Sequence, residues 1–400
     1  MNTRILFVDD EANVLSGLRR MLRGQRKQWD MHFANGGAAA LEMMENEPFD
    51  VVVSDMRMPG IDGAELLTRI AKEYPHTVRL VLSGQSEHER ILRAVGPAHQ
   101  FLSKPCDPDV LIKTIMSACG LQSQLKDKAL INVISQIDSL PCLPNIYREL
   151  IHELESDDTS LDRVAKIIES DIGMTSKILQ LVNSSFFGLP QHVNSPQHAV
   201  SLLGLNVIRP LVLTADAFMQ YEDPDIEGFS LQESIDHSLA VATAARTIAE
   251  AESKDQHLID DAFIGGMMHD IGKLVLAVKL PEQFSQAIEK AKQDKLPFWQ
   301  AEMEVFGTTH AQIGAHLLGL WGLPNPLVEA VAFHHVPSDA HNLAFTPLTA
   351  VHAANVLQQD QYPSDRAAQN AGWDDAYMSE GNFNENVDRW ATLVHQEPVA

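Results

Sequence analysis

The sequence predicts an α/β domain with a doubly wound, five-stranded parallel sheet, followed by an all-α domain. Residues 1–120 alternate short apolar runs with helical patterns, and strands are expected near 4–8, 30–34, 50–54, 78–82 and 99–103. Such alternation is typical of βαβ crossovers, which cover a parallel sheet on both faces. Beyond residue 140 no strand pair is expected, and helices are expected near 144–155, 161–170, 174–184, 196–203, 207–221, 230–252, 258–279, 283–293, 308–319, 325–335 and 344–358.

The chain divides at a proline-rich segment. A long helix is expected from Pro108 through Ile137, with Gly120 as its candidate break, and the prolines of Leu140–Pro144 end that helix and start the next. A short helix is expected near the C-terminus, at residues 386–395, where it docks back onto the domain. We therefore assign four segments, namely the first domain at 1–120, a helical linker at 121–139, the helical domain at 140–358 and a polar tail at 359–400.

Composition limits the classes of function. The chain has 400 residues and a formal net charge of −24, from 54 acidic residues against 30 lysines and arginines. This balance argues against DNA binding, which needs a basic face. The three cysteines have no CxxC spacing and leave an odd count, so we expect a reducing, cytoplasmic location. We find no signal-peptide pattern and no apolar run of about 18 residues, so membrane insertion is not expected.

Charged side chains are expected to gather where the strands of the first domain end. Asp9 and Asp10 follow the first expected strand, Asp55 follows the third, and Lys104 follows the fifth. In a parallel sheet these ends lie at one edge, where ligands bind. Crowded carboxylates repel one another unless a dication lies between them, and Mg²⁺ suits an open site of carboxylates and waters. A carboxylate beside a metal ion and an ammonium can accept a phosphoryl group, because both cations neutralise the charge that develops.

These residues resemble the receiver domain of two-component response regulators, a flavodoxin-like fold, over essentially all of residues 1–120. The resemblance implies that Asp55 is the phosphorylation site. It also implies that Asp10 and Asp55 bind Mg²⁺ directly, that Asp9 holds the ion through water, and that the backbone carbonyl of Arg57 is a further ligand.

Three further positions match receiver residues that respond to phosphorylation. Ser83 matches the switch hydroxyl that turns toward the phosphoryl group, and Phe101 matches the aromatic ring that follows this movement. The resemblance also implies a cis peptide bond between Lys104 and Pro105. Independently of the resemblance, a phosphoryl group on Asp55 needs a hydroxyl donor and a cation, and Ser83 and Lys104 provide them. An aromatic residue in a strand is more often ordinary core, so the role of Phe101 rests on the resemblance.

The second half resembles the HDOD domain, a relative of the HD metal-dependent phosphohydrolases, over about residues 135–345. The matching segments are Leu140–Pro144, Ile167–Asp171, Asn183–Gly188, Leu203–Leu205, Ala262–Lys273, Phe306–Gly307 with His310, and His334–His335. The resemblance implies a signalling output, and many such domains are thought to lack enzymatic activity.

One aspartate and five histidines lie on the expected helices or at their ends, in the order of the HD-enzyme ligands: His237, His269, Asp270, His310, His334 and His335. Such a set can hold one or two divalent ions, such as Fe or Mn, and a metal-bound water can attack phosphorus. Lys273 matches a lysine that steadies the phosphate. Two differences weaken the enzyme hypothesis. Asn355 stands where HD enzymes have an aspartate, and Val336–Ser338 stands where the cyclic-di-GMP hydrolases have Gly-Tyr-Pro.

Three interpretations of these histidines remain open: a working phosphohydrolase, a metal site without activity, and buried histidines that only form hydrogen bonds. Our first hypothesis for the whole chain is a response regulator that is phosphorylated by a sensor histidine kinase. Its helical domain would then recruit or release an unidentified downstream signalling protein, and a homodimer is one way to transmit the signal. The alternative is a phosphorylation-regulated hydrolase of a nucleotide or cyclic dinucleotide. A third hypothesis is a sheet domain that no longer accepts phosphate.

Overall fold

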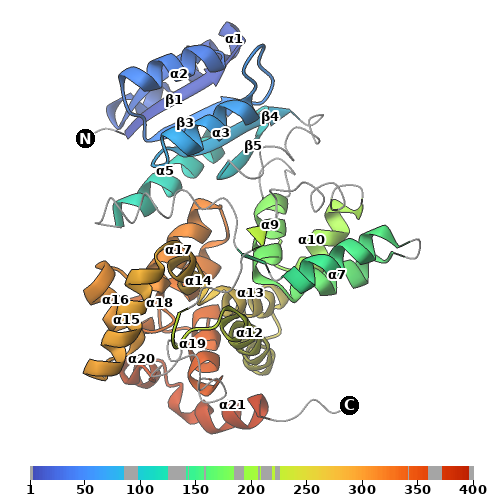
Figure 1. Cartoon of the computed structure of the whole chain (residues 1–400), viewed down its shortest axis with the longest axis vertical. Coiled ribbons are helices and arrows are strands. Elements are labelled where there is room, and N and C mark those ends of the chain that lie inside the picture. The colour runs from blue at the N-terminus through green and yellow to red at the C-terminus, as the bar shows by residue number, and fades with distance from the viewer. Residues whose placement is uncertain are drawn as a thin grey trace.

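The structure is a computed structural model of the chain, and it describes residues 3–84, 98–124, 141–142, 144–156, 159–183, 193–205, 208, 219–220, 226–340, 342–358 and 372–395. Figure 1 shows a sheet domain above a larger helical domain. Among the described residues, no helix is long and apolar enough to cross a membrane.

The first domain is a five-stranded parallel sheet in the order β2-β1-β3-β4-β5. The strands are β1 (Thr3–Asp9), β2 (Trp29–Asn35), β3 (Val51–Asp55), β4 (Val78–Gly84) and β5 (Gln100–Lys104). The order reverses after β1, so the helices between strands cover both faces. Both the predicted fold class and the five predicted strands are confirmed.

Side chains that alternate along each strand fill two cores, one on each face of the sheet. On one face Ile5 and Phe7 pack with α1 (Ala12–Met21), the 3₁₀ helix η1 (Leu22–Lys27) and α5 (Pro108–Gln124). On the other face Leu6 and Val8 pack with α2 (Gly37–Asn46) and α3 (Gly63–Glu73). All four strand residues are buried. This double burial explains why the strands read as continuous apolar runs.

The second domain is largely helical, as predicted. Its elements up to the histidine cluster are β6 (Pro141–Cys142), α7 (Pro144–Glu155), α8 (Leu161–Glu169), α9 (Ile172–Val182), α10 (Pro196–Leu203), β7 (Met219–Gln220), α12 (Leu231–Glu252) and α13 (Gln256–Met268). The remaining elements are α14 (Ile271–Lys279), α15 (Pro281–Asp294), α16 (Phe298–Phe306), α17 (His310–Leu320), α18 (Asn325–Phe333), η2 (Pro337–Ala340), α19 (Pro347–Gln358), α20 (Asp375–Glu380), η4 (Asn384–Asn386) and α21 (Val387–Val394).

Three local predictions differ from the structure, and α16 and α20 lie where no helix was expected. A two-residue parallel pair, β6 with β7, exists where no strand pair was expected, because two residues are too short to show an alternating pattern. The helix expected at 207–221 therefore does not include residues 219–220. The helix expected at 258–279 is two helices, separated by a turn at His269 and Asp270. By contrast, α5 continues through Gly120, and its predicted extension to 137 lies outside the described residues.

The end of the chain packs onto the helical domain. In the segment assigned to a polar tail, α21 contacts α12 and α19, and Trp390 is fully buried. The indole of Trp390 donates a hydrogen bond to Glu252 Oε1, 2.6 Å away. Tyr377 and Phe383 join the same apolar cluster. This cluster covers one side of the α12–α19 pair.

The two domains meet along β5 and α5. Helix α5 contacts α17, and Leu320 from α17 packs into the core of the sheet domain beside Leu111 and Ile115. The side-chain amide of Gln100 donates to the Leu320 carbonyl at 3.0 Å, and the amide of Gln180 in α9 donates to the His99 carbonyl at 3.1 Å. The helical domain therefore holds the end of β5 that lies opposite Lys104.

Candidate functional site

The ends of β1, β3 and β5 bring Asp9, Asp55 and Lys104 together. The ammonium of Lys104 donates to Asp9 Oδ2 at 2.7 Å and also to Asp55 Oδ1. Asp55 Oδ2 accepts from the backbone N–H of Arg57 at 2.6 Å, and Asp9 Oδ1 accepts from that of Glu11 at 2.8 Å. Both aspartates are buried, since Asp9 is 2% exposed and Asp55 is 6% exposed. One lysine thus bridges two aspartates from different strands.

The other predicted residues of this site lie around the bridge. Asp10 is exposed just beyond β1, and among the described residues the three aspartates do not form a set whose ligand atoms all lie within 4.8 Å. Arg57 is exposed after β3, and Phe101 is buried in β5. Ser83 lies at the end of β4, where its backbone pairs with Ser103, and its side chain lies outside the described residues.

The pKa values of the bridge follow from burial and pairing. Burial raises the pKa of Asp55 because it disfavours the carboxylate, and the contact with Lys104 offsets only part of this effect. Burial alone would lower the pKa of Lys104, but its hydrogen bonds to Asp55 and Asp9 outweigh it and raise the pKa. The lysine is therefore a permanent cation beside a carboxylate whose charge is incompletely compensated.

Gly63 allows the turn that follows Asp55 to close. A Cβ at Gly63 would lie 2.2 Å from the Asp55 carbonyl oxygen and 2.9 Å from Met56 Cα. The backbone N–H of Gly63 donates to the Met56 carbonyl at 3.1 Å. Asp62 caps α3 by accepting from Glu65 N–H. These contacts fix the loop that carries Asp55 and the backbone of Arg57.

A second cluster lies deep in the helical domain. His237 comes from α12, His269 and Asp270 from the α13–α14 turn, His310 from the start of α17, and His334 from the end of α18. Each of these side chains is at most 1% exposed. Together with His335, which is partly exposed, they form two overlapping sets of candidate metal ligands that share Asp270. The structure therefore brings all six predicted residues together.

Hydrogen bonds at Nδ1 fix the tautomers of three of the imidazoles. His269 Nδ1 lies 2.7 Å from the Gly266 carbonyl, and His334 Nδ1 lies 2.8 Å from the Val331 carbonyl. Since a carbonyl only accepts, each Nδ1 carries the proton and each neutral ring presents a lone pair at Nε2. His310 Nδ1 is fixed in the same way by Glu302 Oε2, 2.6 Å away.

The Nε2 atoms then face one another. His310 Nε2 lies 3.4 Å from His334 Nε2, 3.0 Å from His335 Nε2 and 3.2 Å from Asp270 Oδ1. Asp270 Oδ1 and His269 Nε2 are buried and accept no hydrogen bond from any described residue. Lone pairs at these distances repel unless a proton or a metal ion lies among them. The donor set of imidazoles and one carboxylate fits Zn²⁺, Fe²⁺ or Mn²⁺.

Burial sets the pKa values in this cluster. It lowers the pKa of His237 to about 3, and it holds the pKa of His334 and His335 well below the ordinary value. For Asp270, burial alone would raise the pKa, but the contacts with His269 and Lys273 outweigh it and hold the pKa well below its usual range. For His310, burial alone would lower the pKa, but the charge of Glu302 and the hydrogen bonds to Asp270 and Glu302 outweigh it and raise the pKa. The cluster therefore favours neutral imidazoles at His237, His334 and His335 beside an ionised Asp270.

Two residues that support the cluster were missed from the sequence. Glu302 in α16 is fully buried, and its Oε2 also accepts from the backbone N–H of His310 at 2.9 Å. His352 in α19 contacts the His334 carbonyl through Nδ1 at 2.8 Å, and its Nε2 lies 3.2 Å from the backbone N of Asp374. Neither stands in a matching motif, and each is separated from its partner by a loop, so no local signal could have found them.

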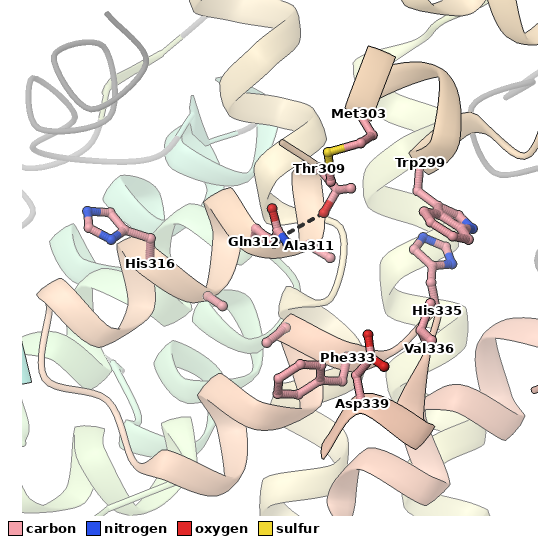
Figure 2. Close-up of a pocket in the computed structure, with 12 residues that line it drawn as sticks. Trp299, Met303, Thr309, Ala311, Gln312, His316, Phe333, His335, Val336 and Asp339 are labelled. Carbon is pink, nitrogen blue, oxygen red and sulfur yellow. Dashed lines mark hydrogen bonds between the residues drawn. The ribbon is translucent and has the colours of Figure 1, made fainter. Parts of the chain in front are cut away.

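A cavity of about 240 Å³ opens beside His335. Figure 2 shows the Trp299 indole next to the His335 ring, with Gln312 of α17 and Thr309, the residue before α17, on another wall. The two rings are nearly parallel, with centroids 6.1 Å apart. Asp339 of η2 lies at the cavity as well. The cavity therefore reaches the histidine cluster at its one partly exposed member.

Comparisons with known proteins identify a family for each of the two domains. The response regulator receiver domain family matches residues 5–116, and the HDOD domain family matches residues 140–337. An uncharacterized protein of Treponema pallidum is 28% identical over 51% of this chain and 39% of its own length. The hydrogenase transcriptional regulatory protein HoxA of Bradyrhizobium diazoefficiens is 33% identical over 31% of this chain. That match covers 25% of HoxA, so the chain spans well under two thirds of these relatives.

Among solved structures, the MmoQ response regulator from Methylococcus capsulatus is 23% identical, covering 63% of this chain and 98% of that chain with a TM-score of 0.47. A signal receiver domain of an HD domain-containing protein from Pseudomonas fluorescens is 30% identical, covering 31% of this chain and 100% of that chain with a TM-score of 0.30. Both family matches coincide with the domains seen in the structure. The chain is therefore a response regulator that joins an N-terminal receiver domain to a C-terminal HDOD domain.

Proposed function

We propose that this protein is a phosphorelay response regulator in which Asp55 accepts a phosphoryl group from a sensor histidine kinase. The observation that carries the proposal is the bridge from Lys104 to Asp9 and Asp55. An ammonium held beside the acceptor neutralises charge that develops on the phosphoryl oxygens. Asp9, Asp10, Asp55 and the Arg57 carbonyl would hold Mg²⁺, which supplies further charge neutralisation when bound.

The structure supports a route by which this site controls the HDOD domain. Lys104 stands at one end of β5, beside Asp55, and Gln100 stands at the other end, bonded to the Leu320 carbonyl. We propose that Lys104, Ser83 and Phe101 respond to phosphorylation, and that β5 and α5 transmit the change to α17. The HDOD domain then acts as an interaction module for a downstream signalling protein, either as a monomer or as a homodimer.

The test is phosphorylation by acetyl phosphate in Mg²⁺, followed by intact-mass measurement. The wild-type chain should gain one phosphoryl group, and Asp55→Asn should gain none. Asp109→Asn is the matched control, because Asp109 is an exposed carboxylate at the start of α5. Equal labelling of wild type and Asp55→Asn would overturn the proposal. No labelling of the wild type would favour a receiver domain that has lost the reaction.

A second candidate function is a metal-dependent phosphohydrolase acting on a nucleotide or cyclic dinucleotide. It is favoured by the unsatisfied acceptors around Asp270 and by the cavity beside His335. Asn355 argues against it, since its amide oxygen lies 3.2 Å from His237 Nε2 and a neutral amide is a weak ligand. Metal content, together with phosphodiester turnover in Mn²⁺ or Mg²⁺, tests it. Absence of both would dismiss this candidate and leave the first proposal intact.

A further inference from the structure

Asp270 divides the histidine cluster into two halves. On the Oδ1 side, His310 Nε2 lies at 3.2 Å and His334 Nε2 at 3.7 Å. His335 belongs to the same set of ligands. On the Oδ2 side, His269 Nε2 lies at 3.3 Å and His237 Nε2 at 3.9 Å. The two halves share one carboxylate and no imidazole.

The Oδ2 half already contains a cation. The ammonium of Lys273, one turn into α14, donates to Asp270 Oδ2 at 2.6 Å, and Lys273 is only 1% exposed. A divalent ion bound to the same oxygen would lie close to this ammonium in a water-poor interior, where like charges repel strongly. The half also offers only two imidazoles, and His237 Nε2 already contacts the Asn355 side chain. Both features disfavour an ion there.

The Oδ1 half has the opposite character. Three imidazoles and one carboxylate oxygen converge on it, which is a complete four-ligand set for a divalent transition metal. Asp270 Oδ1 is buried and accepts no hydrogen bond from the described residues. Glu302 holds His310 through both its backbone N–H and its Nδ1, so the ring keeps Nε2 aimed at this half. Such carboxylate–imidazole pairs orient metal ligands and raise their basicity.

Among the described residues of the cluster, the one that lines a cavity belongs to the Oδ1 half. His335 lines the cavity in Figure 2, whereas His237 and His269 are completely buried. The cavity gives an ion a route to the Oδ1 half past the Trp299 and His335 rings.

We propose that this centre takes one divalent transition-metal ion, bound by Asp270, His310, His334 and His335. Lys273 takes the place of a second ion, and Glu302 is the positioning residue for His310. This inference rests on the metal-binding part of the second candidate function, but it differs from a two-ion site and from a site built on His237 and His269.

The experiment measures metal content and affinity of the full-length chain, loaded with Mn²⁺ or Zn²⁺ and then gel-filtered. We expect one ion per chain in the wild type. The matched pair is His335→Ala, which should lose the ion, and His237→Ala, which should keep it. Glu302→Gln should still take up one ion at saturating metal, with an affinity reduced about 10- to 100-fold in a chelator competition.

Each other outcome has a definite meaning. Two ions per chain, or loss of the ion in His237→Ala but not in His335→Ala, would overturn this inference while supporting a metal centre. No ion in the wild type would overturn both. X-ray absorption at the metal edge of the wild-type chain gives a readout that does not depend on how a variant folds. A spectrum that shows three imidazole ligands and one oxygen ligand on the bound ion would support the proposal. A spectrum that shows two imidazole ligands would contradict it.

Discussion

The two domains each contain a lysine paired with aspartate, but the pairs differ in exposure and in charge balance. In the receiver domain, Lys104 contacts Asp9 and Asp55, and its side chain is 29% exposed. In the HDOD domain, Lys273 pairs with Asp270, and its side chain is 2% exposed. In the receiver domain one ammonium therefore contacts two carboxylates at the edge of the sheet. The HDOD contact is a matched pair sealed among helices.

This difference in exposure and charge balance indicates that the two lysine–aspartate contacts have different roles. An open site with excess negative charge can exchange a cation and accept a phosphoryl group, because water reaches it and Lys104 can move between partners. A sealed, neutral pair resists change, since removing either partner leaves an uncompensated charge in the interior. We therefore expect the receiver pair to respond to signals and the HDOD pair to hold structure around its histidines.

The largest expected contrast is between Asp270→Ala and Asp55→Ala. Removal of Asp270 leaves Lys273 buried without its carboxylate and should lower the free energy of unfolding of the HDOD domain by about 3–5 kcal/mol. Removal of Asp55 leaves a partly hydrated Lys104 that keeps Asp9, so the change in the receiver domain should be about 1 kcal/mol or less. Urea denaturation of both variants measures this, and equal losses would refute the contrast.

Next in size are two glycines that permit backbone contacts at the sites. A Cβ at Gly272 would lie 2.0 Å from the His310 carbonyl oxygen, and one at Gly63 would lie 2.2 Å from that of Asp55. Gly272→Ala and Gly63→Ala should each cost about 1–3 kcal/mol in thermal or urea unfolding, because backbone must shift. Only Gly63→Ala should also slow phosphorylation by acetyl phosphate.

Gly17 in α1 is the control for both variants. A Cβ there meets no atom within 4 Å, so Gly17→Ala should be neutral or stabilising. If the two site variants are as stable as this control, the close backbone contacts do not constrain either site.

A buried aspartate without a lysine provides a third case. Asp261 in α13 receives a hydrogen bond from Asn194 at 3.0 Å, and burial raises its pKa to about 6. Because the folded pKa lies above the unfolded value, Asp261 destabilises the fold increasingly as pH rises from about 4 through 6. Asp261→Asn should therefore be more stable than wild type by about 1–2 kcal/mol at pH 7.5, with no difference near pH 4.

Asp270 should show the opposite trend. Its pKa in the folded state is held below the ordinary value. Ionised Asp270 therefore stabilises the folded state fully at pH values above its ordinary pKa, and this stabilisation is lost as pH falls below it. Unfolding of wild type and Asp261→Asn across pH 4–8 isolates the Asp261 effect, because the Asp270 contribution changes only below this range. A constant difference at all pH values would show that the Asp261 carboxylate is compensated.

The smallest expected effect concerns the contact between the domains. Gln100→Ala removes the hydrogen bond to the Leu320 carbonyl and should weaken the contact by about 1 kcal/mol. Amide hydrogen exchange should become faster at the end of α17 and stay unchanged in β1 and β3. Gln293→Ala is the control, because this exposed glutamine donates a hydrogen bond to Glu289 within α15. Equal exchange in both variants would mean that the bond does not link the regions.

The sequence allowed correct predictions for those residues whose positions follow from the order and direction of the strands. β1 and β3 have clear apolar runs, and because parallel strands end at one edge, Asp9, Asp55 and Lys104 could be expected to meet. The predicted helices did not reveal the turn at His269 and Asp270, since the apolar period continues across it. They also missed α16, which carries Glu302.

Side-chain direction is what the pattern could not supply. Asp10 is adjacent to Asp9 yet exposed, and nothing in the sequence distinguishes the two. The resemblance implies that Lys273 steadies a phosphate, and no pattern in the sequence indicated its hydrogen bond to Asp270. The two residues are three positions apart at the start of α14, and Gly272 between them lets this turn approach the His310 backbone.

The most direct test of the central claim is the chemical modification of lysines in the folded chain, mapped by peptide mass with and without acetyl phosphate and Mg²⁺. Exposed Lys72 serves as the internal reference. The account predicts that Lys104 is modified before phosphorylation and protected after it, while Lys273 is protected in both states. Modification of Lys273 as fast as Lys104, or an unchanged rate at Lys104 on phosphorylation, would contradict it.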